Sequence, residues 1–159
     1  MSLAREVLEA CKARGLMVAT AESCTGGMVA AALTDIAGSS AVVERGFVTY
    51  TNAAKREMLK VREATLEAHG AVSEPVAREM AAGAFAHSHV QIAVAITGIA
   101  GPGGSEHKPE GRVCFALAMA GAPIITETVE FGALGRAQVR QAARDHALVL
   151  LLRAAQSQP

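Results

Sequence analysis

Segments with apolar residues at helical spacing alternate along this chain with short runs rich in apolar, β-branched or aromatic residues. The first segment predicts an amphipathic helix over 2–14, which Ser2 caps and Gly15 ends. These runs predict strands over 16–20, 42–50, 92–97, 112–120 and 124–131, of which those over 16–20 and 92–97 are expected to be buried. The remaining segments predict helices over 27–36, 52–60, 62–69, 73–87 and 135–156.

This order of elements indicates the fold class. Helices between successive strands place those strands in parallel, with helices on both faces of the sheet. The short link Gly121-Ala122-Pro123 predicts a hairpin between the last two strands. We therefore expect an α/β fold, a three-layer α/β/α sandwich with a mixed, mostly parallel sheet of about five strands and one antiparallel strand. At 159 residues, we expect 1–159 to form a single domain.

The amino-acid composition argues against several classes of function. The chain has 15 basic and 15 acidic residues, one Tyr and no Trp, so it lacks the basic excess and the aromatic platform typical of nucleic-acid binding. Cys11, Cys24 and Cys114 form no CxxC pair, and no His or carboxylate cluster has metal spacing, so we predict neither disulfide nor metal. Without a signal peptide or a membrane-length apolar run, we expect a cytoplasmic protein without membrane contact. Its zero net charge and high apolar content favour a homo-oligomer.

Candidate chemistry gathers where three predicted parallel strands end. The segments that follow these strands are Glu22–Gly27, Tyr50–Lys55 and Thr97–Ser105. Ligands of open α/β sheets bind outside such carboxyl ends, so these segments predict a polar, cationic pocket for a small anionic molecule. The two glycine-bearing turns contribute Ser23, Cys24, Thr25, Gly26, Gly27, Thr97, Gly98 and Gly101. Either turn alone is equally well explained as a simple connection, and neither matches a P-loop or GxGxxG.

The same segments contain candidates for acyl transfer. Burial makes a lysine such as Lys55 easier to deprotonate, so that it can act as a general base for a nearby serine. Ser23, Ser39 and Ser40 are the candidate serines. Cys24, before a predicted helix, is an alternative nucleophile because a helix N-terminus lowers a thiol pKa. The alternative interpretation makes Lys55 a solvated surface charge and Tyr50 a ring that caps the core.

Taken together, these segments resemble the CinA C-terminal domain family, the nicotinamide-nucleotide amidohydrolases. The matching stretches are AESCTGG, TDIAGSS, ERGFVTYTNAAK, GAVSEPVA, ITGIAGPGGSEHKPEG and FGALGRAQVRQ. The resemblance implies hydrolysis of the carboxamide of nicotinamide mononucleotide, which yields nicotinate mononucleotide and ammonia for pyridine-nucleotide salvage. It implies an α/β/α fold and no cofactor.

The resemblance also implies residue roles. Ser40 looks like the nucleophile, Lys55 like the general base and Tyr50 like a member of the proton network. Ser23, Cys24 and Thr97 look like pocket residues, and Arg136 like a contact to the phosphate or the carboxamide pocket. The loop Gly101–Pro109 is shorter than in many relatives.

One distance conflicts with these roles. A strand over 43–50 is about 23 Å long at roughly 3.3 Å per residue, which places Ser40 and Lys55 at opposite edges of the sheet. Either Ser40 enters the pocket of a neighbouring subunit, which we favour, or an irregularity at Gly46 ends the strand early and folds Ser40 back. Two other functions stay open: a non-catalytic nucleotide-binding or regulatory module linked to competence or DNA recombination, and a different amidase or esterase that uses the same dyad.

Overall fold

A five-stranded mixed sheet forms the centre of the protein, as described for residues 1–158 in a computed structural model. The strand order is β2-β1-β3-β4-β5. β1 pairs in parallel with β2 and β3, and β4 runs antiparallel to β3 and β5, so β4 alone is reversed. The strands are β1 (Val18–Glu22), β2 (Val43–Val48), β3 (Ile92–Gly98), β4 (Arg112–Met119) and β5 (Ile125–Glu130). The predicted mixed sheet with one antiparallel strand is confirmed.

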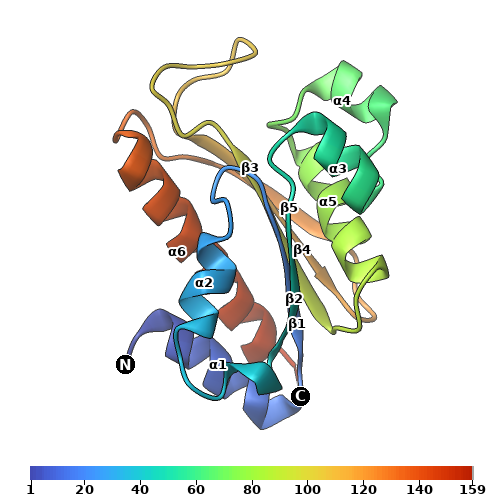
Figure 1. The fold of residues 1–159 in the computed structure, drawn as a ribbon, viewed down its shortest axis with the longest axis vertical. Coiled ribbons are helices and arrows are strands. Elements are labelled where there is room, and N and C mark those ends of the chain that lie inside the picture. Colours follow the sequence, from blue (N-terminus) through green and yellow to red (C-terminus); the bar gives the residue numbers. More distant parts are fainter. Residues whose placement is uncertain (159) are drawn as a thin grey trace.

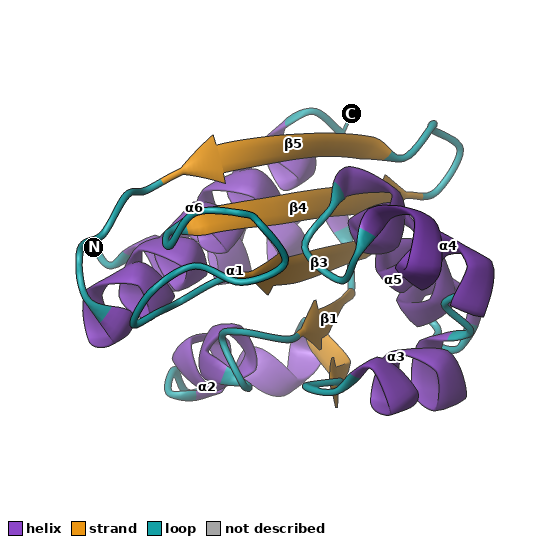
Figure 2. Cartoon of the chain, turned by 90° about the horizontal axis from the view of Figure 1, so that it is seen from above, coloured by secondary structure: helices purple, strands orange, loops and turns teal. Residues whose placement is uncertain are grey.

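Helices cover both faces of this sheet. Figure 1 shows α1, α2 and α6 on one side and α3, α4 and α5 on the other, and Figure 2 shows the same two layers from above. Each layer has its own apolar core: Val7, Val29 and Leu151 belong to one, and Leu59, Val76 and Met80 to the other. The helices are α1 (Leu3–Arg14), α2 (Met28–Thr34), α3 (Asn52–Leu59), α4 (Glu63–His69), α5 (Glu74–Ala86) and α6 (Arg136–Gln156), with a short 3-10 turn η1 (Ser39–Ala41). The predicted three-layer sandwich is therefore confirmed.

Local sequence signals explain where several helices begin. The hydroxyl of Ser2 accepts the Arg5 N–H at the start of α1, and that of Thr51 accepts the Ala54 N–H at the start of α3. Ser73 caps α5 in the same way, with a proline in the first turn. Such caps satisfy backbone donors that have no partner inside the helix. The cap on α3 fixes the segment that carries Lys55.

Strand β1 begins and ends two residues later than the sequence predicts. It includes Glu22, which is fully buried although it is charged. The Glu22 carboxylate accepts the N–H groups of Val29 and Ala30 at 2.9 and 3.1 Å. These are orphan donors of the first turn of α2, and a carboxylate is favoured there by the helix dipole. The turn after β1 therefore begins at Ser23.

Strand β2 does not end early at Gly46. The ladder to β1 has one irregularity, at Glu44, and Gly46 pairs in register with Thr20. A β-carbon at Gly46 would lie 2.7 Å from the Thr20 hydroxyl, so this glycine permits a close approach between neighbouring strands. Of the two explanations for Ser40, the one that folds it back at Gly46 is wrong.

The strand order creates one switch point. From β1 the chain crosses through α2 to β2, and from β2 it returns through α3, α4 and α5 to β3 on the other side of β1. In open α/β sheets with this order of strands, the crevice at the carboxyl ends beside the switch point is the usual ligand position. Within residues 1–158, no helix combines the length and the apolar character needed to span a bilayer.

Candidate active site

Lys55 is the central feature of the crevice, and it is 1 % exposed. Helix α3 directs its side chain beneath the end of β1, where its Nζ lies 3.0 Å from the Ser23 Oγ. The same Nζ lies 3.1 Å from the Thr49 carbonyl oxygen and 3.3 Å from that of Tyr50. Residues from two separate strand ends thus meet around one buried amine.

Burial shifts the protonation equilibrium of this amine toward its neutral form. Burial disfavours the charged form and lowers the pKa of Lys55 from its ordinary value of 10.5, against smaller opposing effects from Cys24 and Glu106. A neutral Lys55 can donate its two N–H groups to the two carbonyl oxygens and accept the Ser23 hydroxyl proton on its lone pair. Ser23 and Lys55 therefore have the geometry of a nucleophile and its general base.

Tyr50 contributes two different groups. Its carbonyl oxygen faces Lys55, whereas its side chain is 56 % exposed at the mouth of the crevice. The phenolic oxygen accepts a hydrogen bond of 2.7 Å from Arg136, which also donates to the Gly101 carbonyl at 2.7 Å. The structure thus brings Tyr50 and Arg136 together at the rim, and the tyrosine hydroxyl contacts the arginine rather than Lys55.

Only part of the turn after β1 lines the crevice. Ser23 and Cys24 line the crevice, whereas Thr25, Gly26 and Gly27 do not. Gly26 and Gly27 both have positive φ, which a glycine adopts readily. Because Glu22 occupies the N–H groups of Val29 and Ala30, these donors of α2 are not available to a ligand.

Cys24 is a poor candidate for the nucleophile. Burial raises the pKa of its thiol to about 12, and this effect exceeds the smaller lowering by a backbone hydrogen bond and by nearby cations. The expectation that a helix N-terminus activates this thiol is therefore wrong, since desolvation dominates. At neutral pH Cys24 is a small apolar group in the wall of the crevice.

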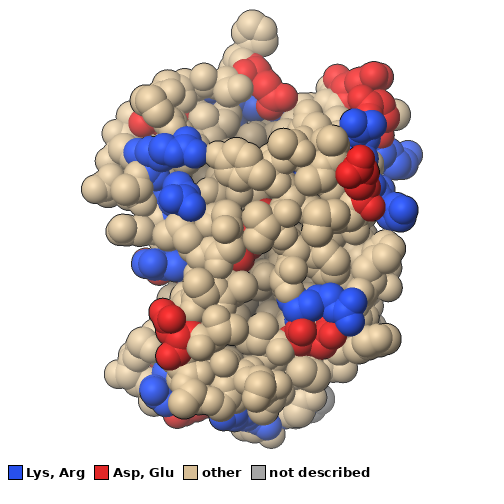
Figure 3. Space-filling model, viewed as in Figure 1, with Lys and Arg blue, Asp and Glu red and all other residues tan. Residues whose placement is uncertain are grey.

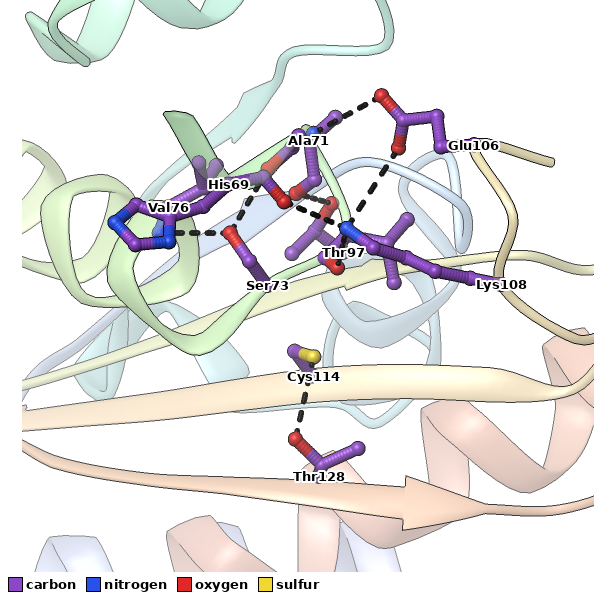
Figure 4. A network of polar contacts seen from close by, with 11 residues as sticks. His69, Ala71, Ser73, Val76, Thr97, Glu106, Lys108, Cys114 and Thr128 are labelled. Atoms are coloured by element: carbon purple, nitrogen blue, oxygen red, sulfur yellow. Dashed lines mark hydrogen bonds and ion pairs between the residues drawn. The ribbon is translucent and has the colours of Figure 1, made fainter. Parts of the chain in front are cut away.

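The loop after β3 forms the opposite wall. Thr97 is 1 % exposed and donates its hydroxyl to the Ala71 carbonyl at 2.9 Å. Figure 4 shows how this contact belongs to a larger network, in which the Lys108 ammonium donates to the carbonyl oxygens of His69 and Val72, each at 2.6 Å. Gly98 and Gly101 lie in the same wall. The network fastens the loop 98–111 to the turn between α4 and α5.

The crevice encloses a volume of about 420 Å³, which is within the usual range for a small-molecule site. The sequence interpretation missed Asn52 and Glu106 among its lining residues. Asn52 lies inside the YTNAAK segment, so its position directly after a strand end was the signal available. Glu106 lies mid-loop, where nothing in the local pattern distinguishes it.

Ser40 lies outside this crevice. It is exposed in η1, at the amino end of β2, whereas Lys55 follows the carboxyl end of the same strand. Within one chain the structure does not bring these two residues together. It does bring Lys55 to Ser23, one of the three serines that the sequence offered.

The surface carries charges of both signs. On the face in Figure 3, Lys and Arg lie near Asp and Glu in small groups, and no broad patch of one sign covers it. Among residues 1–158, the structure gathers no group of three or more His, Cys, Asp or Glu side chains that could hold a metal ion. The polar groups of the crevice are thus hydroxyls, backbone groups, the Asn52 carboxamide, the Lys55 amine, the Glu106 carboxylate and the Arg136 guanidinium.

Fold and crevice together define a doubly wound α/β protein with a small-molecule pocket at its switch point. The model of the CinA C-terminal domain family matches residues 1–155. The nicotinamide-nucleotide amidohydrolase PncC of Escherichia coli K12 is 57 % identical over 152 residues, which cover 95 % of this chain and 92 % of the relative. A CinA-like protein of Mycolicibacterium vanbaalenii is 52 % identical over 141 residues, which cover 88 % of this chain and 33 % of that longer protein.

Solved structures agree with these relatives. The competence/damage inducible protein CihA of Agrobacterium tumefaciens superposes with a TM-score of 0.92 at 51 % identity, covering 96 % of this chain and 93 % of the other. The competence damage-inducible protein A of Klebsiella pneumoniae gives 0.94 at 40 % identity, covering 99 % and 97 %. The chain belongs to the CinA C-terminal domain family.

Proposed function

We propose that this protein is an amidohydrolase that converts nicotinamide mononucleotide to nicotinate mononucleotide and ammonia, with Ser23 as nucleophile and Lys55 as general base. The observation that carries the proposal is the 3.0 Å contact between the buried Lys55 Nζ and the Ser23 Oγ at the wall of the crevice. The activity is that named for the relative from Escherichia coli at 57 % identity. The product would enter pyridine-nucleotide salvage in the cytoplasm.

The geometry of the Ser23–Lys55 pair supports the following reaction. Neutral Lys55 takes the proton of the Ser23 hydroxyl while the oxygen attacks the carboxamide carbon, giving a tetrahedral oxyanion. The resulting Lys55 ammonium donates a proton to the departing amine, which leaves as ammonia and restores the neutral base. Water then attacks the ester on Ser23, with Lys55 taking one of its protons. As the second tetrahedral intermediate collapses, Lys55 returns that proton to the leaving Ser23 oxygen, and the released carboxyl group loses its proton to solvent. The positive charge of the pyridinium ring already activates the carboxamide.

The turn that carries Ser23 offers the oxyanion donors. The Ser23 carbonyl accepts the Gly26 N–H at 3.0 Å, so the Cys24 N–H in the same planar peptide points the opposite way. We assign this N–H, next to the nucleophile, to the oxyanion. Loss of one such donor typically costs about 2.7–4 kcal/mol in transition-state stabilisation.

The phosphate would bind at the rim. Arg136 is the first residue of α6, and its Gly135 cap makes no side-chain hydrogen bond to the helix. A guanidinium and the free N–H groups of a helix start form a suitable site for a phosphate. Here the helix is α6, because the first donors of α2 are bound to Glu22.

The role of Ser40 remains a separate prediction. A homo-oligomer in which Ser40 reaches the crevice of a neighbouring subunit would give an intersubunit site, whereas the Ser23–Lys55 pair is complete within one chain. We assign the nucleophile to Ser23 because its contact with the base needs no second subunit.

The proposal is tested by product analysis with purified protein in the presence of a chelator. The wild type should release ammonia and nicotinate mononucleotide in equal amounts, and Lys55→Met should lose at least about 10³-fold in kcat, as expected for loss of a general base that also activates the nucleophile. Binding of nicotinamide mononucleotide without turnover by the folded wild type would instead support a non-catalytic module. Turnover of other amides or esters alone would indicate a different hydrolase.

A further inference from the structure

Arg140, which does not line the crevice, holds the turn that carries Ser23. It lies one helical turn after Arg136 on α6, and its Nε donates to the Cys24 carbonyl oxygen at 3.0 Å. Its Nη2 donates to the next carbonyl oxygen, that of Thr25, at 3.4 Å. None of the ion pairs within residues 1–158 includes Arg140. The guanidinium is thus committed to two backbone carbonyls.

These contacts fix the orientation of a peptide plane. A trans peptide is planar, and its N–H points away from its carbonyl oxygen. When Arg140 holds the Cys24 carbonyl, the Thr25 N–H of the same peptide points away from α6. The preceding peptide is held by the bond from Gly26 N–H to the Ser23 carbonyl. Both peptides that follow Ser23 are therefore oriented by hydrogen bonds to their carbonyls.

The turn needs such a restraint. Gly26 and Gly27 follow it at φ of 58° and 107°, and glycine restricts the backbone least of all residues. On its other side, the Glu22 carboxylate holds the start of α2. Arg140 lies so close that a β-carbon at Gly26 would be 3.3 Å from its Nη2. The hydrogen bonds from Arg140 thus restrain a turn whose glycines would otherwise leave the backbone flexible.

We propose that Arg140 is a positioning residue for amide hydrolysis: by holding the Cys24 and Thr25 carbonyls it fixes the turn so that the Cys24 N–H, next to Ser23, meets the oxyanion. This inference rests on the proposed function of the Ser23–Lys55 pair. Substrate binding at the Arg136 rim does not depend on Arg140.

The test compares Arg140→Ala, Arg140→Lys and Arg144→Ala with wild type in kcat and KM for nicotinamide mononucleotide. Arg144 lies one turn further along α6 and pairs with Asp145, so Arg144→Ala is the matched control and should stay within about twofold of wild type. Misplaced reacting groups cost about 10²-fold, so we expect Arg140→Ala to lower kcat by roughly that factor with KM within about threefold. The kcat of Arg140→Lys, whose side chain has one donor nitrogen, should lie between those of wild type and Arg140→Ala.

Guanidinium ion added to Arg140→Ala supplies the decisive readout. Millimolar guanidinium hydrochloride, well below denaturing concentrations, should restore part of kcat in this variant and leave wild type and Arg144→Ala unchanged. If Arg140→Ala does not fold, the kcat of Arg140→Lys decides. The inference is overturned if Arg140→Lys, and any Arg140→Ala that folds, keep a kcat near that of wild type. It is also overturned if Arg140→Ala loses kcat and guanidinium does not relieve that loss. An inactive wild type, or an active Ser23→Ala, overturns the proposed function instead.

Discussion

The Nζ of Lys55 lies 3.0 Å from the Oγ of Ser23, although 32 residues separate them in the sequence. Two features create this contact. The Ser23 turn follows β1, and the Thr51-capped helix α3 begins just after β2, the parallel neighbour of β1. The pair is therefore a direct consequence of the sheet order, and the chemistry that we propose depends on it.

The pH dependence of activity should follow the neutral fraction of Lys55. Burial lowers the pKa of this amine from 10.5, and the base acts in its deprotonated form. We therefore expect kcat/KM to rise with pH through the lowered pKa and to level off above it, with the midpoint below 10.5. A rate that is independent of pH across this range, measured with fully folded protein, would contradict a lysine base.

Stability should depend on the same group. Since the folded pKa of Lys55 lies below the unfolded value of 10.5, the unfolded chain binds more protons between those two values, and stability rises with pH in that window. Lys55→Met should remove this dependence and raise the melting temperature at neutral pH, because the folded protein then no longer holds an amine below its unfolded pKa. Thermal melts of both proteins at several pH values provide the measurement. Equal pH slopes would show that Lys55 does not titrate abnormally.

Arg136 should affect binding of the phosphate. Replacement by Met should raise KM for nicotinamide mononucleotide about tenfold, equivalent to about 1.4 kcal/mol, with little change in kcat. Nicotinamide riboside, which lacks the phosphate, is the control substrate, and its kcat/KM should be nearly equal in wild type and Arg136→Met. An equal loss for both substrates would assign Arg136 to the ring or to the structure of the rim.

Glu22 should be important for stability rather than chemistry. Glu22→Ala leaves the buried N–H groups of Val29 and Ala30 without acceptors, so we expect a loss of about 2–3 kcal/mol in the free energy of unfolding. Glu22→Gln keeps one acceptor oxygen and should lose less. Urea titration measures both changes. Equal stability of wild type and Glu22→Ala would show that the carboxylate does not cap α2.

Gly46 should be required for the approach of β2 to β1. Gly46→Ala places a methyl group 2.7 Å from the Thr20 hydroxyl, so we expect a loss of about 1–3 kcal/mol. Thr20→Ala removes that hydroxyl and should relieve part of the loss in the double variant, which a double-mutant cycle quantifies. Strictly additive losses would mean that the clash lies elsewhere.

The sequence predicted the elements and layers well because local signals govern them. Caps at Ser2, Thr51 and Ser73 begin helices where expected. The predicted strand ended at Thr20, two residues too early, because a carboxylate such as Glu22 normally lies outside a buried strand. Its burial is made possible by the N–H groups that it accepts from the first turn of α2, seven and eight residues later.

The candidate site was predictable in part. The strand-end segments correctly pointed to the crevice that contains Ser23, Lys55 and Thr97. The choice among three serines could not be made locally, because it depends on which strand lies beside β2. The raised pKa of the Cys24 thiol, about 12, likewise depends on burial by residues far away in the sequence.

Side-by-side kinetics of Ser23→Ala and Ser40→Ala test the central claim most directly. With nicotinamide mononucleotide as substrate, and with both variants shown to be folded and of wild-type assembly state, Ser23→Ala should lose at least about 10³-fold in kcat. Ser40→Ala should remain within about threefold of wild type, as expected for an exposed side chain outside the crevice. Full activity of Ser23→Ala together with an inactive Ser40→Ala would contradict the account and would place the nucleophile on a neighbouring subunit.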